Sequence, residues 1–120
     1  MGGDITRFPG APGRSRAVVH SGLVFTVATA AVKSASLREQ TEDALRVLDQ
    51  RLAETGTDKT RLLSATVYIT DMGRKPEMNE AWLAWVAPGS EPQRACIGAA
   101  LEGQDLVEIV AVAAAGTSKV

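Results

Sequence analysis

The chain has 120 residues, 45% of them hydrophobic and 22% charged, which fits a single globular domain and excludes a disordered protein. Thirteen basic and fourteen acidic side chains leave a formal net charge of −1, which argues against nucleic-acid binding because that function usually leaves a basic footprint. The single cysteine excludes an intrachain disulfide.

We expect no segment of the chain to cross a membrane. The longest apolar stretch, Leu106–Gly116, is interrupted by Glu108 and has about half of the roughly 20 residues that a spanning helix needs. The N-terminus lacks a charged region followed by an apolar one, which predicts no secretory signal. The expected location is therefore the cytoplasm.

The N-terminal part of the chain predicts an arm followed by a β-hairpin. Residues 1–13 contain Pro9, Pro12 and four glycines, a composition typical of an irregular arm. Two β-rich runs, residues 17–20 and residues 23–27, flank a Ser21-Gly22 turn. This arrangement is the pattern of a hairpin.

A helix is predicted after the hairpin. Ser36 with Glu39 three residues later is a capping box, which indicates that the helix begins there. Gly56 indicates its end. Between these signals, residues that suit one buried face recur at three- and four-residue spacing: Leu37, Thr41, Ala44, Leu45, Leu48 and Leu52.

The second half of the chain predicts a strand and another helix. The β-branched and aromatic run at residues 62–70 is typical of a strand, and Asp71-Met72-Gly73 marks its end. Pro76 suits the first position of a helix, and the Pro-Gly pair at residues 88–89 suits its end.

Two further strands, residues 93–101 and residues 106–115, flank a predicted turn at residues 102–105. The element order is then β-β-α-β-α-β-β, which is typical of an α+β domain with two helices packed on one face of the sheet. The last strand is apolar on both faces, the pattern of a strand that is covered on both sides. Because the helices cover one face only, we expect another copy of the chain to cover the other.

One arginine and one glutamate stand within these two apolar strands. Arg94 shares a strand face with Cys96, and a hairpin through the turn would place Arg94 opposite residues 108–112. Arg94 and Glu108 are therefore predicted to meet across the ladder. They could form an ion pair that seals a subunit interface, or a site in which Arg94 binds a substrate carboxylate and Glu108 activates a water.

The remaining candidates point less clearly to chemistry. A strand cysteine such as Cys96 is usually a small core residue, although its nearness to Arg94 could place it in a pocket. Met78, Trp82 and Trp85 lie on one stripe of the second helix, which is more often core than a ligand platform. His20 has no second ligand at metal-binding spacing, and the chain has no phosphate-binding or dinucleotide-binding motif. We therefore predict no metal site.

Taken together, these segments resemble the RidA/YjgF family of reactive-intermediate (enamine/imine) deaminases, also known as the endoribonuclease L-PSP family. The resemblance covers the chain from about residue 17 to residue 114 and is closest to the short YoaB-like subgroup. The segments that carry it follow one another in the family's order: Gln40-Thr41, Leu63–Met72, Met78–Trp82, and Pro92–Cys96 followed by Leu106–Ile109.

The resemblance implies a chorismate-mutase-like fold that spans residues 1–120 and a homotrimer with three clefts between subunits. It also implies hydrolysis of 2-imino acids, or of their enamine tautomers such as 2-aminoacrylate, to 2-oxo acids and ammonia. Such intermediates leak from pyridoxal-phosphate dehydratases and damage other enzymes. In this family Arg94 would hold the substrate carboxylate, Glu108 would order the attacking water, and Cys96 and Asn79 would line the cleft. No cofactor is implied.

Two departures from the family pattern concern the substrate. Val27-Ala28 stand where typical deaminases carry Ser-Gly, so Ala28 is expected to line the cleft in place of the glycine. The early tyrosine that packs on the substrate has no counterpart, and Arg14, Ser15 and Arg16 stand nearby. The alternative function is a family member that binds a small carboxylate or a protein partner without efficient deamination.

Overall fold

The computed structural model describes residues 4–116. Within this range the chain forms six strands and two α-helices: β1 (Thr6–Pro9), β2 (Ser15–His20), β3 (Leu23–Thr29), α1 (Leu37–Glu54), β4 (Leu62–Ile69), α2 (Lys75–Trp85), β5 (Gln93–Gly98) and β6 (Val107–Ala114). Short 3₁₀ turns, Lys59–Arg61 and Met72–Arg74, lead into β4 and α2.

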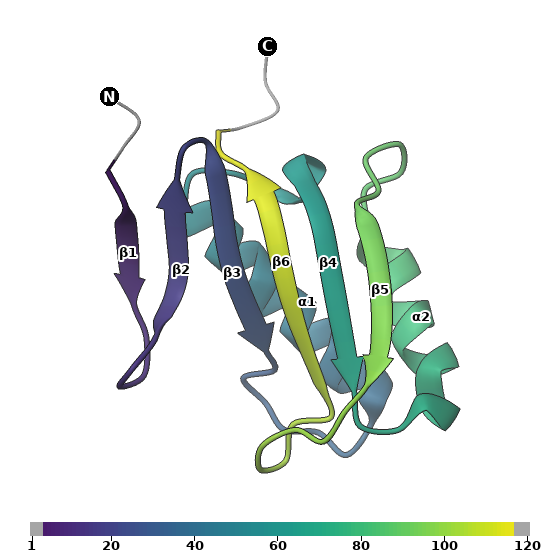
Figure 1. Ribbon diagram of the computed structural model, residues 1–120. Helices are drawn as coiled ribbons and strands as arrows, with labels where there is room; N and C mark the ends of the chain where they lie inside the picture. Colours follow the sequence, from purple (N-terminus) through teal and green to yellow (C-terminus); the bar gives the residue numbers. More distant parts are fainter. Residues whose placement is uncertain (1–3, 117–120) are drawn as a thin grey trace.

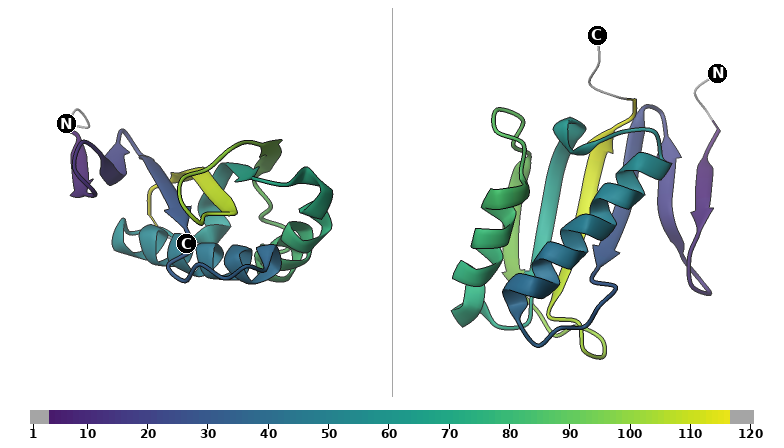
Figure 2. Two further views of the ribbon diagram at one scale, coloured as in Figure 1. Left: turned by 90° about the horizontal axis from the view of Figure 1, so that it is seen from below. Right: turned by 180° about the vertical axis from the view of Figure 1, so that it is seen from behind.

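The strands form one sheet in the order β1-β2-β3-β6-β4-β5. Neighbouring strands are antiparallel except for β4 and β5, which are parallel. Both helices lie against the same face, with α2 beside β5 at one edge (Figures 1 and 2). The predicted α+β class, with two helices on one face of a mixed sheet, is confirmed.

Helix α1 begins and ends where the sequence predicts. The Ser36 side chain accepts a hydrogen bond from the backbone N–H of Glu39 at 3.2 Å, which satisfies one of the free donors of the first turn. Gly56 follows the helix with φ +81°, a left-handed conformation that favours glycine. Leu45, Leu48 and Leu52 are buried against the sheet.

The predicted hairpin between the last two strands is wrong. β6 pairs with β3 on one side and with β4 on the other, whereas β5 pairs only with β4, at the edge of the sheet. Hydrophobic pattern explains the placement. β6 buries Val107, Ile109, Ala111 and Ala113 beneath helix α1, so its central position removes much apolar surface from water. β5 is more exposed along its length and suits an edge.

Residues 4–13 of the predicted arm are more ordered than their composition suggests, and residues 1–3 lie outside the described part of the chain. Residues 6–9 form strand β1 and pair with β2. Pro12 and Gly13 are the central residues of a turn in which the Arg14 N–H donates to the carbonyl oxygen of Ala11 at 3.1 Å. Gly13 has φ +89°, and proline followed by such a glycine is the signature of a type II turn. The prolines and glycines therefore shape a hairpin rather than an irregular arm.

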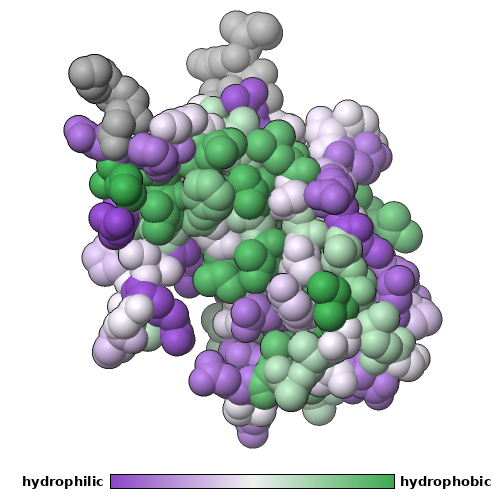
Figure 3. Space-filling view, in the orientation of Figure 1, coloured by the Kyte–Doolittle hydropathy of each residue, from purple (hydrophilic) through white to green (hydrophobic). Residues whose placement is uncertain are grey.

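The face of the sheet opposite the helices is open and apolar. Phe25 and Val110 lie there and are 43% and 39% exposed. Apolar side chains gather on this face over β2, β3 and β6 (Figure 3). In the described part of the chain, neither helix is long and apolar enough to span a membrane. The open face is thus a surface that the helices of its own chain leave uncovered.

Candidate functional site

Arg94 lies on β5 with its side chain directed toward helix α2. It is paired in register with Ala65 of β4, which faces the helices, so Arg94 faces the same side. Its side chain is half-buried. Its Nη1 is 3.8 Å from the Met78 sulfur, and its guanidinium carbon is 5.4 Å from the centre of the Trp82 ring. Among residues 4–116, no carboxylate lies within ion-pair distance of Arg94. The half-buried guanidinium of Arg94 therefore contacts the thioether of Met78 and the aromatic face of Trp82, without a carboxylate partner among the described residues.

Glu108 lies on the opposite face of the sheet. It pairs with Thr29 of β3 and Tyr68 of β4, and its side chain is half-buried on the open face. The prediction that Arg94 and Glu108 meet across a ladder is wrong, because β4 separates their strands and the two residues face opposite sides. An ion pair between them within one chain is excluded by the same geometry.

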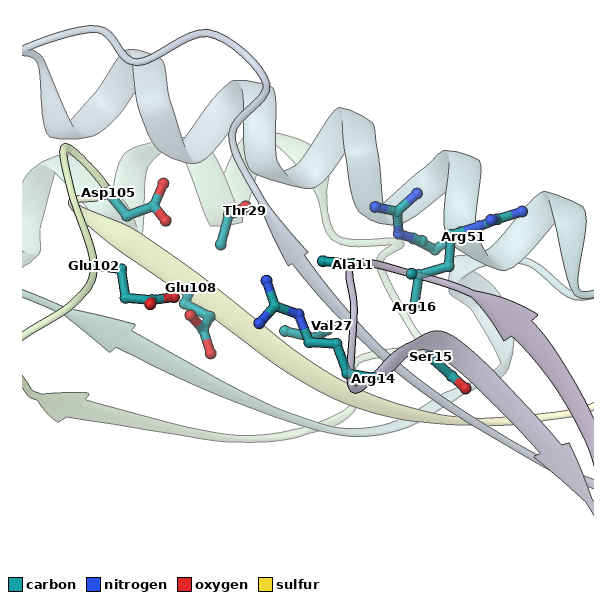
Figure 4. A pocket seen from close by; sticks show the side chains of 11 residues that line it. Ala11, Arg14, Ser15, Arg16, Val27, Thr29, Arg51, Glu102, Asp105 and Glu108 are labelled. Atoms are coloured by element: carbon teal, nitrogen blue, oxygen red, sulfur yellow. The ribbon is translucent and has the colours of Figure 1, made fainter.

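Glu108 lines a pocket of about 410 Å³ (Figure 4). The β1–β2 turn, the end of β3, helix α1 and the loop that precedes β6 enclose it. Its lining residues are Gly10, Ala11, Arg14, Ser15, Arg16, Val27, Thr29, Arg51, Glu102, Asp105 and Glu108. This size is within the usual range for small-molecule sites.

A buried glutamine holds in place the loop that carries acidic residues of this pocket. The Gln40 side chain is fully buried and donates to the carbonyl oxygens of Ser34 and Gln104 at 2.9 and 2.8 Å. Its amide oxygen accepts from the Leu106 N–H at 2.9 Å. These bonds tie the start of α1 to the loop that carries Glu102 and leads to Glu108.

Several charges in the pocket wall are neutralised by partners. Arg16 donates two hydrogen bonds to Glu54, at 2.7 and 2.8 Å, and Asp105 pairs with Lys33. The hydrogen bonds from Arg16, together with its charge and that of Arg51, hold the pKa of the Glu54 carboxyl below its ordinary value. Within residues 4–116, Arg14 and Glu108 form no ion pair with a protein group.

The other predicted site residues lie in different places. Cys96 is half-buried on the same face as Arg94 and packs against the core. Asn79 is half-buried on α2, and its side-chain oxygen is buried without a hydrogen-bond partner in the described chain. Ala28 is 1% exposed and faces the helices, so the prediction that it lines the cleft is wrong. Alternation along β3 places Val27 in the pocket wall instead.

The two tryptophans of α2 have different surroundings. Trp82 is buried and lies beneath the Arg94 guanidinium. The Trp85 N–H donates to Asp49 at 2.9 Å, and Lys59 lies 5.0 Å from its ring centre, so it joins α2 to α1 and to the 3₁₀ turn before β4. Trp85 is structural, whereas Trp82 contacts a candidate site residue.

Sequence reasoning did not single out Thr29, Glu102 and Asp105 as pocket residues. They meet Glu108 only because β6 inserts beside β3 and brings its preceding loop to the end of that strand. The turn signature Ala11-Pro12-Gly13-Arg14 could have revealed that Arg14 is held at a fixed position.

The domain has two helices on one face of a mixed sheet, an apolar face that its own helices leave open, and a polar pocket beside the end of β3. Comparison with known proteins assigns its family. The model of the family described as endoribonuclease L-PSP matches residues 5–115. The chain belongs to this family, to which the YjgF and RutC proteins belong.

Individual relatives support the same assignment. A RutC family protein of Haemophilus ducreyi is 48% identical over 63% of this chain and 66% of its own length. The RutC family protein YoaB of Escherichia coli is 34% identical over 83% of this chain and 89% of its own, which confirms the expected YoaB-like character. The crystal structure of a YjgF family member from Neisseria meningitidis superposes with a TM-score of 0.91 at 40% identity, over 96% of this chain and 98% of that one.

Proposed function

We propose that the protein hydrolyses 2-imino acids, or their enamine tautomers, to 2-oxo acids and ammonia in clefts between subunits. The observation that carries this proposal is the Arg94 guanidinium, which is half-buried and has no carboxylate partner among residues 4–116. A charge in such surroundings is rarely left without a counter-ion. A substrate carboxylate, bound by the planar fork of Arg94, supplies one.

The reaction needs an activated water and a proton for the leaving nitrogen. Glu108 takes a proton from water while the water oxygen forms a bond to the imine carbon, and the C=N bond becomes a C–N single bond. Glu108 passes that proton to the nitrogen, which gives a neutral carbinolamine with one hydroxyl and one amino group. The hydroxyl proton then moves to the nitrogen through Glu108, the C–N bond breaks, and ammonia leaves as the 2-oxo group forms. The imine and one water are thereby converted to a 2-oxo acid and ammonia, and no cofactor takes part.

The substrate must contact residues of two chains if both side chains act on it. Arg94 and Glu108 face opposite sides of their own sheet, so one chain does not present both to a small molecule. Packing of the open face, with Phe25 and Val110, against another subunit would bury its exposed apolar area and close the cleft. A homotrimer, in which each cleft takes Glu108 from one subunit and Arg94 from the next, meets this requirement.

The oligomeric state is the first testable consequence. We expect light scattering at micromolar concentration to give about three times the chain mass of 12.6 kDa. Val110→Asp should shift the distribution toward monomer, because it places a charge on the apolar face that the subunits bury. A wild-type protein that remains monomeric would contradict the shared cleft.

Trp82 is predicted to be a positioning residue for Arg94. Trp82→Leu should raise KM for the imine more than it lowers kcat, because the guanidinium loses the ring against which it rests. Trp82→Phe, which keeps an aromatic face, should restore most of the affinity. Trp85→Leu removes the same side chain from the same helix and leaves the Arg94 contact itself in place. Because the Trp85 ring centre lies 5.5 Å from that of Trp82, this control measures the effect of looser packing around Trp82. Equal effects of both leucine variants on KM would show that general packing is responsible.

The activity itself is tested with a pyridoxal-phosphate dehydratase that releases 2-iminobutanoate or 2-iminopropanoate. The remaining imine is trapped with semicarbazide in the presence and absence of this protein. We expect the protein to lower the trapped imine in proportion to its concentration. Unchanged trapping at high protein concentration would contradict a deaminase.

Binding of a small carboxylate without efficient turnover is the second candidate function. The specific observation in its favour is Val27, an apolar residue in the pocket wall at the position of the Ser-Gly pair of typical deaminases. Calorimetry with a 2-oxo acid distinguishes the two candidates. Binding without loss of imine would favour the second.

A further inference from the structure

One end of the pocket beside Glu108 is rich in arginine, and carboxylates of the protein neutralise only part of that positive charge. Three guanidinium groups, those of Arg14, Arg16 and Arg51, line it. Glu54 is bonded to Arg16 through both of its oxygens. Arg51 has a buried Nε without a hydrogen-bond partner in the described chain, and no carboxylate of residues 4–116 pairs with Arg14. Arg14 is thus without a counter-ion among residues 4–116, and Arg51 adds a second positive charge to the pocket wall.

The other end of the pocket is acidic. Asp105 is neutralised by Lys33, whereas Glu108 and Glu102 form no ion pair within residues 4–116. The close view shows the three acidic side chains gathered at one end, with Arg16 and Arg51 at the other. Arg14 lies between them, and its guanidinium reaches past Val27 toward the acidic end (Figure 4).

The position of Arg14 is set by the backbone rather than by chance. It is the last residue of the type II turn, and its N–H is bonded to the carbonyl oxygen of Ala11. Gly10 packs so closely that a Cβ there would lie 2.8 Å from the carbonyl oxygen of Arg14 and 2.9 Å from the Arg16 nitrogen. The turn therefore presents Arg14 to the pocket at a fixed place, which lowers the entropy cost of binding through it.

We propose that Arg14 binds a second carboxylate of the substrate, with Arg51 adding positive charge to the same pocket wall, so that this site prefers 2-imino dicarboxylates of four or five carbons. The inference rests on the proposed function, in which Arg94 of the neighbouring subunit holds the first carboxylate and Glu108 stands beside the imine carbon. The substrate's side chain then extends along Val27 to Arg14. An aliphatic side chain would leave the Arg14 guanidinium without an anion, whereas a terminal carboxylate provides one.

A 2-imino dicarboxylate is hydrolysed by the same steps as other 2-imino acids. One water adds to the imine carbon, ammonia leaves, and a 2-oxo dicarboxylate is the product. The second carboxylate takes no part in bond making or breaking. Its contribution is to affinity and to the choice between substrates, so that Arg14 is a specificity residue.

The test compares two stable product analogues of five carbons, 2-oxoglutarate and 2-oxopentanoate, which differ in a terminal carboxylate. Calorimetry on the assembled protein should give about 10- to 100-fold tighter binding of 2-oxoglutarate, the range expected for hydrogen bonds to a charged group. In Arg14→Gln the ratio of the two affinities should fall close to one. Arg7→Gln, an exposed arginine of β1 outside the pocket, should keep the wild-type ratio.

Two results would overturn the inference. One is equal affinity of the wild-type protein for both acids. The other is an Arg14→Gln variant that weakens both acids by the same factor, which would mean that Arg14 acts on Glu108 and not on a second carboxylate. The imines of glutamate and alanine, made by amino-acid oxidases, test the chemistry separately. If neither imine is hydrolysed while 2-oxoglutarate still binds preferentially, the deaminase proposal fails and the assignment of a dicarboxylate ligand stands.

Discussion

Arg94→Ala is expected to abolish ligand binding and imine hydrolysis while the protein stays folded and assembled. A substrate carboxylate that loses its bidentate partner should lose roughly 2–5 kcal/mol of binding free energy, as in truncated buried pairs. The fold should tolerate the change because the contacts of Arg94 are with Met78 and Trp82, and it has no carboxylate partner within residues 4–116. Calorimetry with a 2-oxo acid and the rate of imine loss measure the two effects.

Arg94→Lys separates the effect of the positive charge from that of the guanidinium geometry. It keeps the positive charge but loses the planar fork and the flat surface that lies over Trp82, so we expect it to remain poor in both assays. Light scattering and thermal unfolding provide the control for structure. If Arg94→Ala dissociates or unfolds the protein, Arg94 is an interface residue and its role as a carboxylate anchor is wrong.

Local signals in the sequence were sufficient to predict most helices and strands of the fold. The Ser36–Glu39 pair and Gly56 delimit α1 in the sequence and in the structure because capping and left-handed glycine act within a few residues. The hairpin between β2 and β3 forms around Ser21-Gly22 for the same reason. Such features depend on backbone chemistry that neighbouring residues determine.

The position of β6 could not be read from local signals. Two strands joined by a short connection most often pair, and the turn at residues 102–105 favoured that arrangement. The pairing of β6 with β3 and β4 is decided by burial across the whole sheet. Its alternate residues from Val107 to Ala113 lie on the face that helix α1 covers, a contact between segments far apart in the chain.

The arrangement of the candidate site also could not be predicted from local sequence signals. The sequence identified Arg94 and Glu108 as charges in apolar strands, and the structure places both half-buried. Their relation was wrong because it depended on the incorrect strand pairing. Of the Val27-Ala28 pair that the sequence placed in the cleft wall, Val27 lines the pocket and Ala28 does not, since neighbours in a strand face opposite sides.

Glu108→Gln is expected to reduce turnover far more than ligand affinity. The substitution preserves volume and hydrogen bonding but removes the negative charge and the basicity that water activation needs. Loss of general acid–base assistance typically lowers rates by about 10²- to 10⁴-fold, and we expect kcat to fall within this range. Affinity for a 2-oxo acid should change little, because the carboxylate is held by Arg94 of the neighbouring subunit.

Glu102→Gln is the matched control for the loss of one negative charge from the same pocket. Glu102 lines the acidic end but stands on the loop before β6, so its substitution should cost much less turnover than that of Glu108. The competing account makes Glu108 a counter-ion that keeps an arginine in place. In that case calorimetry would show Glu108→Gln losing product affinity by the same factor as the imine-loss rate, and equal losses would rule out water activation because a general base contributes to the transition state and not to product binding.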